Sequence, residues 1–171
     1  DYITSNDQYI APTFGDLDGD GDMDMLAGDY DGDLRYYENS GSSTAYDFNS
    51  VSTNPFGLAD AGSHSTPVFV DLDNDGDLDV LSGTSYQYFK YYENSGTALV
   101  AAFEPAQTSP FGLGSAGHAK PAVADLDNDG DFDVLVGHSS GVFYYWQNNG
   151  TAASPAFGSF QQNPLGYVGL L

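Results

Sequence analysis

The sequence of 171 residues contains no cysteine and very few positive charges. The absence of cysteine excludes disulfide bonds, thiolate catalysis and cysteine-based zinc sites. Arg35, Lys90 and Lys120 are the only fixed cations against 25 acidic residues, and the formal net charge is −22. Nucleic-acid binding needs clustered lysine and arginine, and an anionic membrane surface repels an acidic chain. We therefore expect no nucleic-acid partner.

Long apolar runs are also missing, because none approaches the roughly 18 residues that span a bilayer. We expect no membrane insertion. Hydrophobic residues nevertheless make up 40% of the chain and aromatic residues 15%, which is too apolar for a disordered acidic tail. The 21 glycines and 8 prolines are spread along the chain as turn residues, and this distribution favours many short strands.

A repeat of about 55 residues organises the chain. The stretches DLDGDGDMDMLAG, DLDNDGDLDVLSG and DLDNDGDFDVLVG begin at Asp16, Asp71 and Asp125, which are 55 and 54 residues apart. The same spacing separates YYENSG at Tyr36 from YYENSG at Tyr91. Several landmarks that keep one register indicate an internal repeat. We expect a single repeat domain over 1–171, with units at about 8–55, 63–110 and 117–164, and 165–171 as the start of a fourth repeat phase or a closure segment.

Each unit predicts four short antiparallel strands. Apolar runs such as PVFVDL lead into the aspartates, and segments such as DVLSG follow them. An aromatic strand comes next, in which Phe89 and Tyr91 face one way and Lys90 and Tyr92 the other. A less regular fourth strand is expected near AAFEPAQ and PAFGSFQ. No segment shows a useful helical periodicity, so the predicted class is all-β.

Strands that are apolar on both faces must be covered on both faces. Four-stranded units of this length that pack against copies of themselves are typical of β-propeller blades. Three blades are fewer than the roughly four to eight of a closed propeller. The chain can be a fragment of a longer propeller, one of several copies that close a ring, or a unit of an open fibre. We expect self-association or further blades, because exposed edges favour pairing.

The three aspartate stretches follow the pattern D-x-D-x-D-G-D-x-D, and the glycine allows a sharp turn. Crowded carboxylates repel one another unless a dication binds them. Calcium accepts six to eight oxygen ligands, whereas magnesium demands octahedral geometry and zinc prefers histidine or cysteine. The alternative, a set of solvated acidic turns, needs only one or two such residues. We expect about three Ca²⁺ ions, one per repeat, held by side chains at positions one, three, five and nine and by the carbonyl at position seven: Asp16, Asp18, Asp20, Asp22 and Asp24; Asp71, Asp73, Asp75, Asp77 and Asp79; Asp125, Asp127, Asp129, Asp131 and Asp133.

The stretch PAVADLDNDGDFDVLVGHSSGVFYYWQNNG resembles an FG-GAP-like or VCBS-like repeat, the calcium-loop blade of integrin alpha-chain heads and many bacterial surface proteins. The resemblance covers nearly the whole chain. It implies a β-propeller, one calcium between the first and second strands of each blade, and an extracellular setting. Members of these families serve as adhesion modules, as lectins and as non-catalytic parts of enzymes. The Gly-Ala-Pro part of the FG-GAP signature is missing after VLVG, which favours the VCBS-like branch.

Several other polar residues have two interpretations. His64 and His118 hold the same repeat position, and we expect loop packing there, with a ligand-contacting ring as the alternative. Asp29, Asp31 and Asp33 form an extra acidic turn, which we expect to be solvent-exposed, with a further cation site as the alternative. The sequence NGT at Asn149 is a single glycosylation sequon in a predicted turn. The aromatic stripe is expected to pack the core rather than stack on sugars.

These features predict a non-enzymatic, calcium-stabilised extracellular module with a structural or adhesive role. Self-assembly into a cell-surface layer or fibre fits this prediction, and glycans or surface proteins are candidate partners. No serine or acid is placed to form a triad with a histidine, so no catalytic residue is assigned. The alternative is a lectin-like propeller that binds carbohydrate. A non-catalytic part of a secreted polysaccharide-active enzyme is the third hypothesis.

Overall fold

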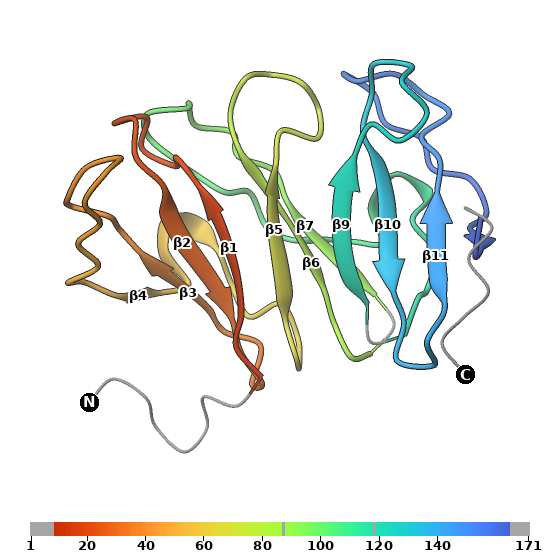
Figure 1. Ribbon diagram of the computed structural model, residues 1–171, viewed down its shortest axis with the longest axis horizontal. Coiled ribbons are helices and arrows are strands. Elements are labelled where there is room, and N and C mark those ends of the chain that lie inside the picture. Colours follow the sequence, from red (N-terminus) through yellow and green to blue (C-terminus); the bar gives the residue numbers. More distant parts are fainter. Residues whose placement is uncertain (1–8, 87, 118, 165–171) are drawn as a thin grey trace.

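The computed structural model describes residues 9–86, 88–117 and 119–164, and each repeat in this part folds into one antiparallel four-stranded sheet (Figure 1). The strands of each sheet, which we call a blade, follow one another in chain order. Blade 1 contains β1 (Ala11–Gly15), β2 (Asp24–Gly28), β3 (Leu34–Tyr37) and β4 (Ser52–Thr53). Blade 2 contains β5 (Thr66–Val70), β6 (Asp79–Gly83), β7 (Phe89–Tyr92) and β8 (Gln107–Thr108). Blade 3 contains β9 (Lys120–Ala124), β10 (Asp133–Gly137), β11 (Phe143–Trp146) and β12 (Gln161–Gln162).

These three sheets confirm the predicted all-β class with four antiparallel strands per repeat. The three sheets stand side by side in chain order, with β5 between β1 and β9 (Figure 1). The exact limits of the repeat units stay a prediction, and the proposed closure segment 165–171 lies outside the described residues. Within the described residues, no helix is long and apolar enough to cross a membrane.

The fourth strand of each blade is much shorter than the sequence suggested. It spans two residues, and in blade 2 it pairs Gln107 with Tyr91 at the end of the predicted segment. Pro105 lies just before this strand and has no N–H group to donate to a ladder. The preceding hairpin keeps two backbone bonds, from the Ser95 N–H to the Ala102 carbonyl (3.0 Å) and from the Glu104 N–H to the Glu93 carbonyl (2.8 Å). Asn94 adds to them, because its Oδ1 accepts the N–H groups of Gly96 (3.1 Å) and Ala102 (2.9 Å). A side chain therefore replaces part of the strand pairing.

The core lies between the blades rather than within any one of them. One cluster joins blades 1 and 2 and contains Leu26 and Tyr92, while a second joins blades 2 and 3 and contains Tyr91 and Val134. Tyr91 and Tyr92 are neighbours in β7 and point to opposite faces, which confirms the predicted alternation. Because both faces of blade 2 are covered, all five residues of β6 are buried. The aromatic stripe therefore packs the core.

The connection from one blade to the next begins with a tight turn. It is a single 3₁₀ turn at η1 (Pro55–Gly57) after blade 1 and at η2 (Pro110–Gly112) after blade 2. Phe56, at the centre of the first turn, has a left-handed backbone with φ of 59°, which is uncommon for a bulky residue. Its carbonyl oxygen accepts a hydrogen bond from the N–H of Phe103 in blade 2 at 2.7 Å. The second turn makes the equivalent bond to Phe157.

Candidate metal centres

An aspartate-rich loop joins the first and second strands of every blade. In blade 2 it runs from Asp71, after β5, to Asp79 at the start of β6. Ligand oxygens at 2.3–2.6 Å from one calcium ion can lie up to about 5 Å apart. In each loop, carboxylate oxygens of the first, third and fifth aspartates lie within 4.8 Å of one another. The three clusters are Asp16, Asp18 and Asp20; Asp71, Asp73 and Asp75; and Asp125, Asp127 and Asp129.

The first aspartate and the glycine at position six shape the loop together. In blade 2 the Asp71 carboxylate accepts hydrogen bonds from the N–H groups of Asp75 and Gly76, both at 3.1 Å. Gly76 has φ of 100°, and a Cβ added to it would meet nothing within 4 Å. The glycine is therefore required for its backbone conformation rather than for space. The equivalent glycines, Gly21 and Gly130, have φ of 93° and 98°.

The seventh aspartate places an uncompensated oxygen inside each loop. Asp77 is 7% exposed, and its Oδ1 has no hydrogen-bond partner among the described residues. Burial, together with the nearby carboxylates of Asp75 and Asp73, raises the pKa of Asp77 to about 6. A bound dication would offset this accumulation of charge. Asp22 and Asp131 show the same orphaned oxygen, and ligation through the seventh carbonyl stays a prediction.

The ninth aspartate has a hydrogen-bonding role that the sequence interpretation missed. Asp79 is 1% exposed, and its carboxylate accepts the Tyr91 hydroxyl (2.7 Å) and the N–H groups of Leu72 (3.0 Å) and Asn94 (2.8 Å). Burial is the main cause that raises the pKa of Asp79 to about 7, and these donors oppose the rise. The clusters of converging carboxylates within the described residues do not include this position. Side-chain ligation by Asp24, Asp79 and Asp133 therefore stays a prediction.

A repeated spacing could have revealed the partners of the ninth aspartate. In every unit a tyrosine follows it by 12 residues and an asparagine by 15, and both donate to its carboxylate. The tyrosine hydroxyl must stay protonated to donate, and burial raises its pKa. The three sets are Tyr36 and Asn39; Tyr91 and Asn94; and Tyr145 and Asn148. These residues fix the start of the second strand beneath the loop.

The third loop differs from the first two in one neighbour. Gln147 in blade 3 donates a hydrogen bond through Nε2 to Asp127 Oδ2 at 2.5 Å. Glu38 and Glu93 occupy the matching position in the other repeats. The third cluster therefore has one fewer nearby negative charge, and one of its carboxylates already accepts an amide.

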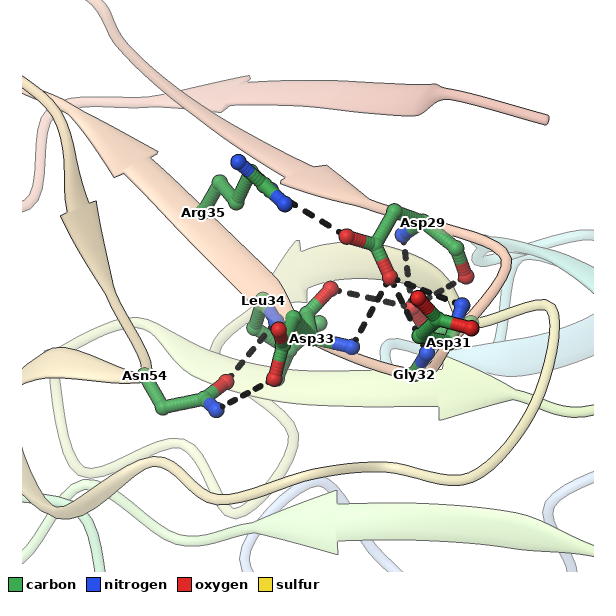
Figure 2. Close-up of polar contacts among 8 residues, drawn as sticks. Asp29, Asp31, Gly32, Asp33, Leu34, Arg35 and Asn54 are labelled. Atoms are coloured by element: carbon green, nitrogen blue, oxygen red, sulfur yellow. Dashed lines mark hydrogen bonds and ion pairs between the residues drawn. The ribbon is translucent and has the colours of Figure 1, made fainter. Parts of the chain in front are cut away.

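The extra acidic turn of blade 1 is a closed hydrogen-bonded structure (Figure 2). Asp29 is 1% exposed, so the expectation of a solvent-exposed turn is wrong for this residue. Its Oδ1 accepts the N–H groups of Asp31, Gly32 and Asp33, each at 3.0 Å. Its Oδ2 accepts Arg35 Nε at 3.1 Å. Because the carboxylate is engaged on both oxygens, the turn serves the β2–β3 hairpin and gives no support to a further cation site.

His64 and Asn149 make their own contacts outside the three aspartate triads. The His64 ring packs against Tyr30 and Tyr9, with centroids 4.4 and 5.0 Å apart, in agreement with the loop-packing interpretation. His118 lies outside the described residues. Asn149 is exposed and donates to the carbonyl of Gln147 at 3.1 Å, and its glycosylation stays a prediction.

The comparison with known proteins agrees with this repeated architecture. The family model described as FG-GAP-like repeat matches residues 16–82 and again 71–136, so each match runs from one aspartate loop into the next blade. A search of curated proteins finds no match to this chain. Clustered hard oxygens and buried orphaned carboxylate oxygens fit a divalent cation such as calcium. The two overlapping family matches agree with the three aspartate loops and the three four-stranded sheets. The chain therefore belongs to the FG-GAP-like repeat family.

Proposed function

We propose that the chain is an extracellular calcium-binding module with a structural or adhesive role and no catalytic activity. The observation that carries this proposal is the convergence of three aspartates in every blade, at the same place between the first and second strands. The orphaned oxygens of Asp22, Asp77 and Asp131 add to the argument, because a buried, unpaired carboxylate is costly without a cation. Oxygen ligands in a flexible loop favour calcium over magnesium.

Calcium would act by stabilising each blade at the loop that starts its second strand. An extracellular-type site has a dissociation constant of roughly 10⁻⁴ M. At millimolar calcium each such site adds about 1.4 kcal/mol by mass action, and three sites add about 4 kcal/mol. The low calcium concentration of a cytosol would leave sites of this affinity empty. The proposed location is therefore secreted or on the cell surface, in line with the setting that FG-GAP-like repeats imply.

Calorimetric titration and thermal unfolding test the calcium proposal directly. We expect about three calcium ions per chain and a clear rise in melting temperature between EDTA and millimolar calcium, with a smaller rise in magnesium. Asp75→Asn removes a carboxylate from one cluster and should abolish binding of one ion. Glu104→Gln is the matched control, because this exposed acid pairs with Ser95 outside the loops. An unchanged melting temperature in calcium would refute the proposal.

Carbohydrate binding is a second candidate function, favoured by one aromatic cluster. Tyr9, Tyr30 and His64 lie together, and the two tyrosines are 68% and 42% exposed. Tyr9 and His64 also line a cavity of about 880 Å³, which Lys120 and His138 border. Exposed aromatic faces beside polar groups suit the apolar and hydroxylated faces of a sugar.

A glycan array with the intact chain tests the second candidate. Binding that is lost in Tyr30→Ala, and kept in the similarly exposed Tyr88→Ala, would support a sugar site at this cluster. Signals that stay flat across the array would remove the lectin hypothesis and leave the calcium proposal untouched.

A further inference from the structure

The two interfaces between blades inside the chain show how one blade packs against the next. In each, the second-strand leucine and third-strand tyrosine of one blade pack against the next blade. Leu26 and Tyr36 of blade 1 meet Val80 and Tyr92 of blade 2 in one buried cluster. Leu81 and Tyr91 of blade 2 meet Val134 and Trp146 of blade 3 in the other. Each blade thus has a following face, toward the next blade, and a preceding face, toward the one before.

The following face of blade 3 repeats the same side chains but is open. Leu17 and Leu72 are 3% and 2% exposed, whereas their counterpart Leu126 is 43% exposed. The second-strand leucine changes in the same direction, since Leu81 is 0% exposed and Leu135 only partly buried. Tyr145, the counterpart of the buried Tyr91, is also only partly buried.

The preceding face of blade 1 is open in the same way. Phe14 is 56% exposed, whereas its counterpart Phe69 packs against the cluster between blades 1 and 2. Met25 and Tyr37 are partly buried, although the matching residues of blades 2 and 3 are 0% exposed. Ile10, at the start of this face, is 48% exposed. The described part of the chain therefore carries one unmatched following face and one unmatched preceding face.

Glycines at the ends of the second strands give an independent measure of this pairing. A Cβ on Gly28 would lie 2.4 Å from the carbonyl oxygen of Ser65, and one on Gly83 would lie 2.1 Å from that of Ala119. The next blade's backbone thus passes directly over both glycines. Gly137 has the same place in blade 3, but the nearest atom to a Cβ there, a ring carbon of Phe143, is 3.9 Å away in the described structure.

The first strands of the three blades converge on one cavity. One cavity is lined by residues of all three first strands, including Pro12, Pro67 and Pro121. Blades that converge on one axis form an arc, and repeating the same step leads toward a ring rather than a straight stack. Heterologous contacts close when their rotation completes a circle. Six blades lie within the usual range of four to eight for a closed propeller.

We infer that the following face of blade 3 binds the preceding face of blade 1 in a second copy, so that two copies close a six-bladed ring. Leu126, Leu135 and Tyr145 of one copy pack against Phe14, Met25 and Tyr37 of the other. The backbone at Ile10 of the second copy passes over Gly137, as that of Ser65 passes over Gly28. This inference goes beyond the proposed function and does not depend on it, because these contacts need no metal ligand.

Sedimentation of the intact chain in millimolar calcium and moderate salt tests the inference. Moderate salt screens the repulsion between copies of charge −22. The expected species contains two copies of the 18.2 kDa chain and grows no further as concentration rises. A monomer at about 100 μM chain with a normal calcium response would overturn the inference while leaving the calcium proposal intact. Species that keep growing would overturn the closed ring.

Mixing two variants tests the head-to-tail geometry. Phe14→Lys and Leu126→Lys each break one face and lower the negative charge, so added repulsion cannot explain a loss of assembly. Each variant alone should be monomeric, with at least tenfold weaker association. An equal mixture should form pairs through one intact interface, because the following face of the Phe14→Lys copy meets the unchanged preceding face of the Leu126→Lys copy. A mixture that stays monomeric would contradict the inference. Tyr86→Lys, at a 68% exposed site on neither face, is the matched control.

Gly137→Ala separates assembly from folding. The described structure has room for this methyl group, so the melting temperature at low chain concentration should not change. Association should weaken at least tenfold, because the second copy's backbone would meet the new Cβ. Unchanged association would show that no blade passes over Gly137 and would overturn the inference.

Discussion

Blade 2 and blade 3 have nearly the same sequence around their aspartate loops, but they are buried to different extents. DLDNDGDLDVLSG and DLDNDGDFDVLVG differ only by leucine against phenylalanine and serine against valine. Even so, Leu72 is 2% exposed and Leu126 43%, and the leucine of the second strand is fully buried in blade 2 but only partly buried in blade 3. The difference comes from neighbours, since blade 2 lies between two blades and blade 3 follows only one. In a repeat protein, burial is a property of the position in the array.

The largest expected difference between the two blades is the cost of truncating this leucine. Leu81→Ala opens a cavity in a fully buried cluster and should lower the free energy of unfolding by about 3 kcal/mol. Leu135→Ala removes a partly exposed side chain and should cost about 1 kcal/mol. Urea unfolding at low chain concentration measures both. Equal costs for the two substitutions would mean that another surface already covers the following face of blade 3.

Removing the tyrosine hydroxyl that supports the ninth aspartate should have the next largest effect. Tyr91→Phe takes a donor from a buried carboxylate and should cost about 2 kcal/mol. Tyr145→Phe removes the matching bond from a partly exposed site and should cost about 1 kcal/mol. Thermal unfolding in EDTA compares the two without metal effects. A larger loss of stability for Tyr145→Phe than for Tyr91→Phe would contradict this prediction.

The pH dependence of the calcium-free protein follows from the raised carboxyl pKa values in blade 2. Asp77 and Asp79 have pKa values of about 6 and 7, above the roughly 3.9 of an unfolded chain. The folded state therefore holds these protons more tightly, and this contribution to stability is lost as pH rises through 6 to 7. Calcium needs ionised ligands, so the gain in melting temperature on adding calcium should increase from pH 5 to pH 8.

Substituting the seventh aspartate of each loop tests which loops cause this pH dependence of stability. Asp77→Asn should make the fall in melting temperature of the calcium-free protein with rising pH smaller by about 3 °C. This is the shift expected for roughly 1 kcal/mol in a chain of this size. Asp131→Asn should act in the same direction, because burial also raises the pKa of Asp131. Glu104→Gln should leave the slope unchanged. A slope that neither loop substitution changes would assign the pH dependence to other groups.

The smallest expected effect concerns the residue that distinguishes the third loop. Gln147→Glu should release Asp127 from its amide bond and restore the charge present in the other repeats. Calcium affinity of this site should rise about 1.4- to fivefold, the range for a surface charge interaction of roughly 0.2–1 kcal/mol. Glu93→Gln should lower the affinity of the second site by a similar factor. Site-resolved calcium titration by NMR measures both changes.

The repeat and the loops were predictable from the sequence because both depend on residues close together in the chain. The spacing of Asp16, Asp71 and Asp125 located three sheets, and the alternation of Tyr91 and Tyr92 placed them on opposite faces. The short fourth strand was less predictable, because the Asn94 side chain takes over part of the pairing in the hairpin that precedes it.

The prediction of the site was limited for the same reason. Alternating aspartates indicated a ligand set, but the role of Asp79 depends on Tyr91 and Asn94, which lie 12 and 15 residues away. Asp29 was expected at the surface because it stands among polar residues. It is buried because its own turn folds around the carboxylate. In both cases hydrogen bonds, rather than composition, decided the environment.

The turn at Phe56 has a consequence for the mechanics of the protein. A flexible linker would let neighbouring blades rotate, but here the connection begins with a tight turn whose carbonyl is bonded to the next blade at Phe103. Rotation of one blade against the other would have to break this bond and disturb the buried cluster beside it. Tension applied along the chain would therefore be resisted by blade pairs as units. Such stiffness would keep the angle between neighbouring blades fixed.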